Sequence, residues 1–413
     1  MAKARKDSRG RALRKGESWR KVDQRYAYTY MDPLGRRKFI YANDLQTLRE
    51  REKQLMKDQL DGLDLYVAGK ATLNDTFDRY MSTKYDLREH TRSGYLYTYD
   101  HFVRDDFGKK KLIDVKYSDV LQYYYYLLNE RGIALGTLDS VHCLLHPTFQ
   151  LAVRDDIIRK NPTDGVMREV TKNAGKNKGV RHALTVDEQR AFMGFIAESP
   201  VFYKWWPMFT VLLGTGCRIG EAMGLRWDDL DFENRVISVN HSVVYYPVKG
   251  TKEAVMRISL PKTDAGIRTI PMLDIVKDAF ELEREEQMET TGLSTAVLDG
   301  MTGFVFQNRY GSVPNPQSVN KVIKRIISCY NSEEVVNAKK EGREPLMLPD
   351  FSCHHLRHTF ATRLCEAESN LKVIQSVMGH KNFETTMDIY AEATDRKKQE
   401  SFENLAAKLD NIF

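Results

Sequence analysis

The feature that most constrains the fold is a short polar segment near the middle of the chain. Residues 171–181 read Thr-Lys-Asn-Ala-Gly-Lys-Asn-Lys-Gly-Val-Arg. A basic, glycine-containing segment of this kind is typical of a flexible linker rather than of a packed core. The chain therefore divides into domains on either side of it, and 413 residues suffice for two or three of them.

Composition narrows the class of protein. The hydrophobic fraction is 42%, enough for packed cores, and no apolar run reaches the roughly 20 residues that span a bilayer. The best candidate run, Pro207–Cys217, is short and predicts a buried helix. The basic N-terminus has no apolar signal region after it, and five scattered cysteines without a CxxC pair indicate a reducing compartment. We expect a cytoplasmic protein without a membrane partner.

Residues 1–66 are predicted to form a small basic module of β-sheet plus helix. Residues 25–41 alternate like two strands around a turn, and apolar residues recur at helical spacing over 45–60, with Asn43 or Asp44 placed as the cap. A two-stranded ribbon fits the major groove of DNA, and basic flanks hold phosphates. A solvated basic tail is the alternative explanation of the charge. The predicted DNA contacts are Arg9, Arg11, Lys15, Arg20, Lys21, Arg36 and Arg37 here, and Lys172, Lys176 and Lys178 in the linker.

Residues 70–165 have the apolar spacing of four or five helices and predict a helical bundle. The run Tyr123–Tyr126 suggests base stacking, but its more common explanation is that some rings belong to the core. We place a basic linker at 166–182 and a further domain at 183–395, opened by a capping box between Thr185 and Glu188.

Two features of this last domain suggest phosphate chemistry. Arg218 follows a glycine-rich break near a helix start, and Glu221 is three residues on, within side-chain reach. A guanidinium held there can fork onto two phosphate oxygens, although an ordinary Arg–Glu helix pair gives the same pattern. Lys262 lies between two β-prone stretches, on a predicted hairpin from which it can donate a proton; Lys252 competes for this role, and a solvated turn lysine is the plain alternative.

Further along, His354 and Arg357 share one helical face and can donate to one phosphate together. The HxxxH spacing of His354 and His358 raises zinc binding as a rival, but the zinc-hydrolase motif needs Glu where His355 stands. Then His380 follows a glycine that ends a helix, and Tyr390 comes ten residues later. A phenol with a pKa near 10 becomes a useful nucleophile when cations stabilise its anion.

In this order, the segments TGCRIGE, LPKT, HHLRHTFAT and MGHKNFETTMDIYA resemble the tyrosine recombinases, the lambda-integrase-like phage integrase family. The N-terminal segments SRGRALRKGESWRK and RYAYTYMDPLGRRKFIYA resemble the arm-binding domain of conjugative-transposon integrases in particular. The resemblance implies a multidomain, mainly α fold with small β elements. It consists of an arm-binding sheet and helix module, a helical, SAM-like core-binding bundle and a mixed α/β catalytic domain.

The resemblance also implies a role for each residue. Tyr390 matches the nucleophile, and Arg218 and Arg357 match the arginines that clamp the scissile phosphate. Lys262 matches the lysine that protonates the leaving 5′-oxygen. His354 and His380 match the histidines that assist proton transfer and support the phosphate, and Glu221 matches an acidic residue that supports the first arginine.

The implied function is site-specific integration and excision of a mobile element through a 3′-phosphotyrosyl intermediate, with no metal, ATP or other cofactor. The implied partners are double-stranded DNA at core and arm sites, three further copies in a homotetramer, and an excisionase or DNA-bending protein, in a bacterial cytoplasm near the nucleoid. Residues 396–413 form a predicted tail helix that docks on its own domain or on a neighbouring protomer. Chromosome-dimer resolution, a type IB topoisomerase and an inactive DNA-binding regulator are the alternatives.

Overall fold

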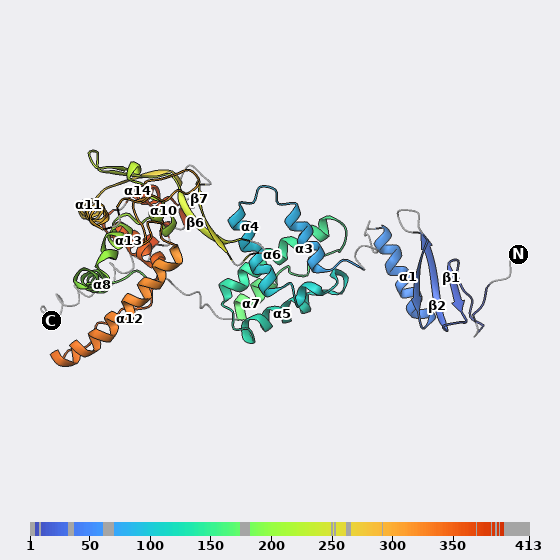
Figure 1. Ribbon diagram of the computed structural model, residues 1–413. Coiled ribbons are helices and arrows are strands. Elements are labelled where there is room, and N and C mark those ends of the chain that lie inside the picture. Colours follow the sequence, from blue (N-terminus) through green and yellow to red (C-terminus); the bar gives the residue numbers. More distant parts are fainter. Residues whose placement is uncertain are drawn as a thin grey trace. The chain divides into compact units, whose positions relative to one another are not determined.

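The chain divides near the predicted linker, into a unit of residues 1–178 and a unit of residues 179–413 (Figure 1). The computed structural model describes residues 5–7, 10–31, 37–60, 70–173, 182–248, 251, 253–261, 266–290, 292–368, 370–380, 382–384, 386–387 and 389–391.

The first unit begins with a three-stranded antiparallel sheet, ordered β1-β2-β3. Its strands are β1 (Glu17–Arg20), β2 (Arg25–Met31) and β3 (Arg37–Ala42), and α1 (Leu45–Leu60) follows. The predicted strand pair and helix are therefore present, and β1 is an addition. Asp44 is the cap, since its Oδ1 accepts from the backbone N–H of Thr47 at 2.8 Å. Leu45 and Leu48 of the helix pack on Tyr26 and Ala42 of the sheet.

The helical bundle that follows has its own core. Its helices are α3 (Leu73–Ser82), α4 (Glu89–Phe102), α5 (Tyr117–Asn129), α6 (Leu135–Arg154) and α7 (Val166–Asn173). Tyr123 and Tyr124 are buried in this core, and Tyr125 and Tyr126 pack partly buried against it. The tyrosine run therefore serves the core, as the more common explanation holds.

The predicted linker begins too early in the chain. Residues 166–173 form α7 rather than a linker, because Val166 and Val170, one helical turn apart, are both fully buried in the bundle. Residues 174–181 of the predicted linker lie outside the described residues.

The second unit is built around a large core of helices. They are α8 (Val186–Glu198), α9 (Trp206–Thr215), α10 (Ile219–Gly224), α11 (Asp274–Glu289), α12 (Pro316–Glu341), α13 (Cys353–Ala367) and α14 (Leu371–Met378). The predicted capping box opens α8: Thr185 Oγ1 accepts from the N–H of Glu188 at 3.1 Å, and the Glu188 carboxylate accepts from the N–H of Thr185 at 2.7 Å. The predicted apolar run becomes α9, which is almost wholly buried.

Two small antiparallel sheets complete this unit. One has the order β4-β5-β8, from Leu230–Asp231, Val236–Val239 and Arg268–Pro271; the other pairs β6 (Ser242–Pro247) with β7 (Ala254–Ser259). The sequence predicted that the stretches on either side of Lys262 form one hairpin, and this prediction is wrong. Instead, β7 pairs with β6 and β8 pairs with β5. Lys262 falls between β7 and β8 in the sequence and lies outside the described residues.

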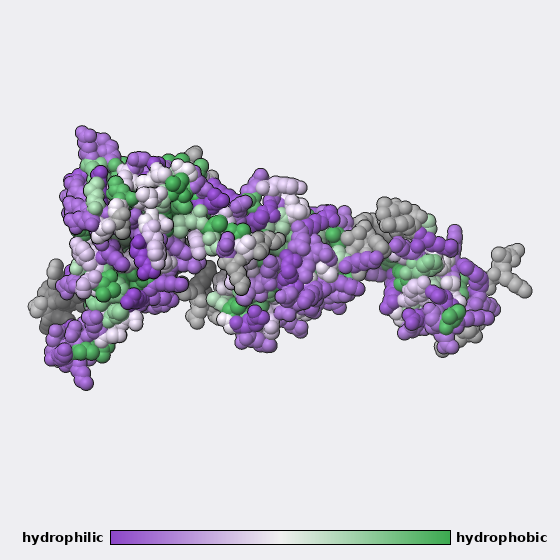
Figure 2. Space-filling view, viewed as in Figure 1, coloured by the Kyte–Doolittle hydropathy of each residue, from purple (hydrophilic) through white to green (hydrophobic). Residues whose placement is uncertain are grey.

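Hydrophilic side chains cover most of the bundle surface on the face drawn in Figure 2. Within the described part of the chain, no helix is both long and apolar enough to cross a membrane.

Gly220 lets α10 approach β6 closely. A Cβ at this position would lie 2.5 Å from the Val243 carbonyl oxygen, whereas a Cβ on Gly194, exposed in α8, meets nothing within 4 Å. We expect Gly220→Ala to lower the free energy of unfolding by about 1–3 kcal/mol. Gly194→Ala should raise it by up to about 1 kcal/mol. Urea unfolding followed by tryptophan fluorescence tests this, since three of the four tryptophans lie in this unit. Equal stability of both variants would contradict the packing argument.

Candidate active site

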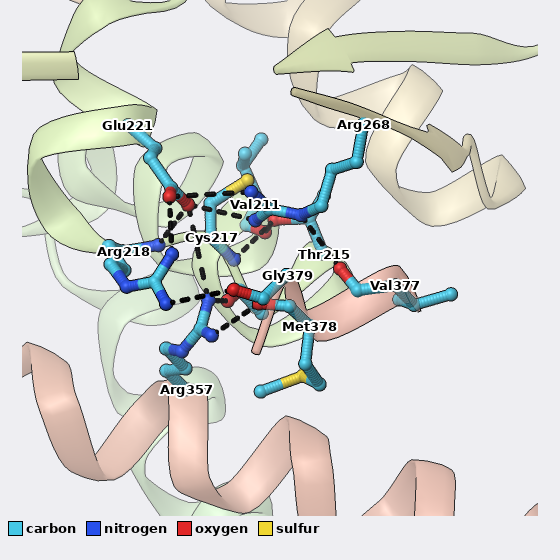
Figure 3. Close-up of polar contacts among 11 residues, drawn as sticks. Val211, Thr215, Cys217, Arg218, Glu221, Arg268, Arg357, Val377, Met378 and Gly379 are labelled. Atoms are coloured by element: carbon cyan, nitrogen blue, oxygen red, sulfur yellow. Dashed lines mark hydrogen bonds and ion pairs between the residues drawn. The ribbon is translucent and has the colours of Figure 1, made fainter. Parts of the chain in front are cut away.

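The C-terminal end of α14 is the point at which the site is assembled. Its last backbone carbonyls accept from three different arginines, as Figure 3 shows. Arg268 Nε donates to Val377 at 2.8 Å, Arg357 Nη2 to Met378 at 2.5 Å and Arg218 Nη2 to Gly379 at 3.3 Å. A helix C-terminus leaves its carbonyls unsatisfied and carries partial negative charge, so it stabilises nearby cations.

Glu221 binds the same arginines from the other side (Figure 3). Its Oε1 accepts from Arg218 Nη1 at 2.7 Å, and its Oε2 accepts from Arg268 Nη2 at 2.8 Å. Arg357 Nη1 lies 3.9 Å from Oε2. Glu221 Oε2 also accepts from the backbone N–H of Arg218, at 2.9 Å, which fixes the first turn of α10. A buried carboxylate thus joins three positively charged side chains.

This arrangement leaves both Glu221 and Arg357 charged at neutral pH. Burial alone raises the pKa of Glu221, but the hydrogen bonds and charge of Arg268, with those of Arg218, offset it and bring the pKa to about 2. Burial, and after it the charge of Arg218, lowers the pKa of Arg357 to about 10. Among the described residues, the cluster of Arg218, Arg268, Arg357 and Glu221 therefore holds an excess of two positive charges.

Arg357 is itself buried on α13. Besides Met378, its guanidinium donates to the carbonyl of Gly216, at 2.6 Å. Gly216 ends α9 with a positive φ of 62°, and a Cβ there would lie 2.2 Å from the ring of Phe360. Glycine is therefore required at this position by both backbone conformation and space. An arginine has five N–H donors, so Arg357 keeps donors for a phosphate.

His380 follows the α14 terminus directly. Gly379 takes the left-handed conformation, φ 61°, that ends the helix as predicted. The His380 Nδ1 lies 3.0 Å from the hydroxyl of the fully buried Thr386. Partial burial, together with the charges of Arg357 and Arg218, lowers the pKa of His380 to about 4, so the ring is neutral at pH 7.

Of the other predicted residues, His354 and Tyr390 are described. His354 lies exposed in the first turn of α13, one turn before Arg357. Tyr390 is half-buried and packs on the cluster formed by Ala361, Cys365, Ile374 and Met378 of α13 and α14, the two helices that supply Arg357 and the carbonyls. Lys262 and Lys252 lie outside the described residues.

Family comparisons identify what kind of site this is. The phage integrase family matches residues 182–397, which contain all of these residues. The chain is 31% identical to the transposase from transposon Tn916 of Enterococcus faecalis, over 95% of either chain. The chain belongs to the tyrosine recombinases of the phage integrase family. It is a DNA breaking and rejoining enzyme and a site-specific recombinase of the integrase type, related to the integrases of conjugative transposons.

Solved structures agree with this assignment. The Tn1549 transposon integrase bound to transposon right end DNA matches with a TM-score of 0.68 and 30% identity, covering 81% of this chain and 100% of that one. A lambda integrase tetramer bound to a Holliday junction matches with a TM-score of 0.52 over 91% of this chain and 94% of that one; at 17% identity it shows the shared fold. The DNA binding domain of Tn916 integrase matches residues 1–59.

Sequence reasoning missed one member of the recombinase site, Arg268. Its side chain is 4% exposed and ion-paired with Glu221. The signal was available: Arg268 and Ile270 are alternate residues of one short strand and both face inward. An arginine at an inward-facing strand position needs a buried acid or carbonyl partner.

The predicted DNA-contacting residues of the N-terminal module are mostly exposed. Arg20, Arg37, Phe39 and Tyr41 share the sheet face opposite the one that α1 covers. Arg20 lies over the ring of Tyr41 and Arg37 over that of Phe39. Arg11 is instead bound within the module, donating to Asp7 and to Tyr26. Lys15, Lys21 and Lys172 are exposed, and Arg9, Arg36, Lys176 and Lys178 lie outside the described residues.

The described residues offer no candidate metal site. Across the described ranges, no cluster of three or more His, Cys, Asp or Glu side chains is arranged to hold an ion.

The neutral state of His380 predicts a pH dependence of stability. Between pH 6.5 and about 4 the unfolded chain binds a proton at His380 that the folded chain does not. Stability from this group is therefore present above pH 6.5 and is lost as the pH falls towards 4. We expect His380→Gln to reduce the loss of melting temperature between pH 6.5 and 4.5, measured by tryptophan fluorescence. An unchanged pH slope in the variant would contradict the burial argument.

Proposed function

We propose that this recombinase integrates and excises a mobile DNA element by forming a 3′-phosphotyrosyl bond through Tyr390. The observation that carries the proposal is the fixed group of arginines around Glu221 and the α14 carbonyls, with Tyr390 packed on the same helices. A phosphodiester under attack gains negative charge on its non-bridging oxygens. A preorganised cationic site stabilises that charge without rearranging during the reaction.

The proposed reaction gives each residue the role that its match to the family implies. Arg218 and Arg357 bind the non-bridging oxygens, and the Tyr390 oxygen attacks phosphorus as His354 assists removal of its proton. The bond from phosphorus to the 5′-oxygen breaks, its electron pair goes to that oxygen, and Lys262 supplies the proton. His380 supports the phosphate, and Glu221 keeps Arg218 in place. Attack of a 5′-hydroxyl on the phosphotyrosyl bond reverses these steps and joins the strands.

In this proposal neither a metal ion nor ATP takes part. The arginines supply the charge that a metal would otherwise provide, and a general acid supports the leaving oxygen. The phosphotyrosyl bond retains the energy of the original phosphodiester, so rejoining needs no further energy source.

The N-terminal module, residues 1–66, is assigned to arm-type DNA sites. Its exposed sheet face offers Arg20 and Arg37 beside Phe39 and Tyr41, and the match to the Tn916 DNA-binding domain supports this role. Replacing both arginines with alanine should weaken arm-site binding and make it less sensitive to salt. An unchanged affinity in low salt would reject the assignment.

The remaining domain assignments complete the proposal. Residues 70–165 contact the core site, the basic linker ends at 182, and residues 183–395 carry the catalysis. Four copies act on two duplexes in the cytoplasm, close to the nucleoid, and an excisionase or DNA-bending protein sets direction. The tail at 396–413, outside the described residues, docks on a neighbouring protomer. Unchanged recombination and assembly on DNA after deletion of 397–413 would reject the docking.

Tyr390→Phe tests the central step. The substrate is a nicked duplex that carries the core site, identified by sequencing DNA trapped covalently on the wild-type chain. We expect no covalent adduct from Tyr390→Phe because the phenolic oxygen is absent. Arg218→Lys should bind this duplex normally and cleave it about 10²–10³-fold more slowly, since lysine cannot replace the guanidinium fork. An adduct formed by Tyr390→Phe would overturn the assignment of the nucleophile.

A further inference from the structure

Arg268 makes more contacts inside the site than its position on a short strand would suggest. It is the first residue of β8, where it pairs in register with Val239 of β5. Its guanidinium leaves the sheet and binds Glu221 through both terminal nitrogens, at 2.8 and 3.3 Å, while Nε donates to Val377. One side chain thus connects a strand, the start of α10 and the end of α14 (Figure 3).

These contacts reach residues of the proposed reaction without requiring Arg268 to touch DNA. Glu221 is the partner of Arg218, and Val377 lies three residues before His380. Strand β8 begins six residues after Lys262. Through Glu221, Arg268 is therefore connected to the proposed phosphate clamp. Through Val377 it is connected to the chain segment that carries the phosphate-supporting histidine, and it lies close in sequence to the proposed proton donor.

The charges indicate what Arg268 contributes. A buried carboxylate must be paired, because the cost of leaving it alone in a low-dielectric site is large. Arg268 occupies one side of Glu221, and Arg218 occupies the other. If Arg268 were absent, Glu221 would turn to the next cation, Arg357, whose Nη1 is only 3.9 Å away. Donors needed for the phosphate would then bind the carboxylate instead.

We propose that Arg268 is a positioning residue for strand cleavage, which pairs with Glu221 so that the guanidinium groups of Arg218 and Arg357 stay available to the scissile phosphate. This inference rests on the proposed function. It adds a residue that acts through Glu221 and the α14 carbonyls rather than through contact with DNA.

The test compares Arg268→Met and Arg268→Lys in the full chain. Arg343→Met is the control, because it also removes an arginine that is ion-paired with a glutamate. The partner in this case is Glu334 of α12. Single-turnover cleavage is measured at saturating nicked core-site DNA, beside the affinity for that DNA and the folded fraction. The same series is run on a duplex with an uncharged methylphosphonate at the scissile position.

We expect Arg268→Met to bind DNA within about threefold of wild type and to cleave about 10²-fold more slowly per folded molecule. Arg268→Lys keeps the positive charge but loses the forked guanidinium, so its cleavage rate should lie between those of Arg268→Met and wild type. Arg343→Met should cleave at the wild-type rate. On the methylphosphonate duplex, the cleavage rate of Arg268→Met should be closer to that of wild type. The uncharged group develops less negative charge for Arg218 and Arg357 to stabilise.

Wild-type cleavage by folded Arg268→Met, or an equal deficit on both substrates, would overturn the inference. If Arg268→Met does not fold, Arg268→Lys carries the same two comparisons with the same criteria. Failure of the proposed function looks different, because the wild-type chain itself would then form no tyrosine-linked adduct.

Discussion

The catalytic unit depends on one buried carboxylate, that of Glu221, placed among three arginines. Three guanidinium groups so close together would repel one another. Glu221 from one side and the carbonyls of Val377, Met378 and Gly379 from the other offset that repulsion. Because these contacts come from α10, α13, α14 and β8, the charged cluster fixes the relative positions of four elements distant in the sequence.

The same arrangement explains why such a site can act on a phosphodiester. Two positive charges remain in excess, in a partly water-excluded setting where they act more strongly than in water. The donors are already oriented before DNA binds, so little reorganisation accompanies the reaction. His380 stays neutral beside these charges, which suits a ring that donates its one N–H to a phosphate oxygen without adding to the repulsion.

Local signals predicted much of this structure. The Thr185 capping box, the Asp44 cap and Gly379 depend on residues a few positions apart, so spacing alone revealed them. The pairing of β8 with β5 depends on contacts about 30 residues apart, and the sequence wrongly predicted one hairpin around Lys262. The helix α7 was missed because most of its segment is polar and only Val166 and Val170 are fully buried.

The proposed catalytic residues came from an ordered resemblance that names residues but, apart from Arg218 and Glu221, not their partners. It assigned Arg218 and Glu221 to each other, which the geometry matches at 2.7 Å. It did not include Arg268, because the position gained its meaning only when β8 was placed beside α10 and α14. A buried charge with a distant partner is difficult to recognise from sequence unless its strand alternation is read with burial in mind.

The most direct measurement is the stability of Glu221→Gln, compared with Asp187→Asn. Asp187 pairs with Arg190 at the same three-residue spacing, at 2.8 Å, but that pair is exposed on α8. If Glu221 holds the arginines together, Glu221→Gln loses about 3–5 kcal/mol of unfolding free energy in urea, followed by tryptophan fluorescence. Asp187→Asn loses at most about 1 kcal/mol. A Glu221→Gln chain as stable as Asp187→Asn would contradict the account.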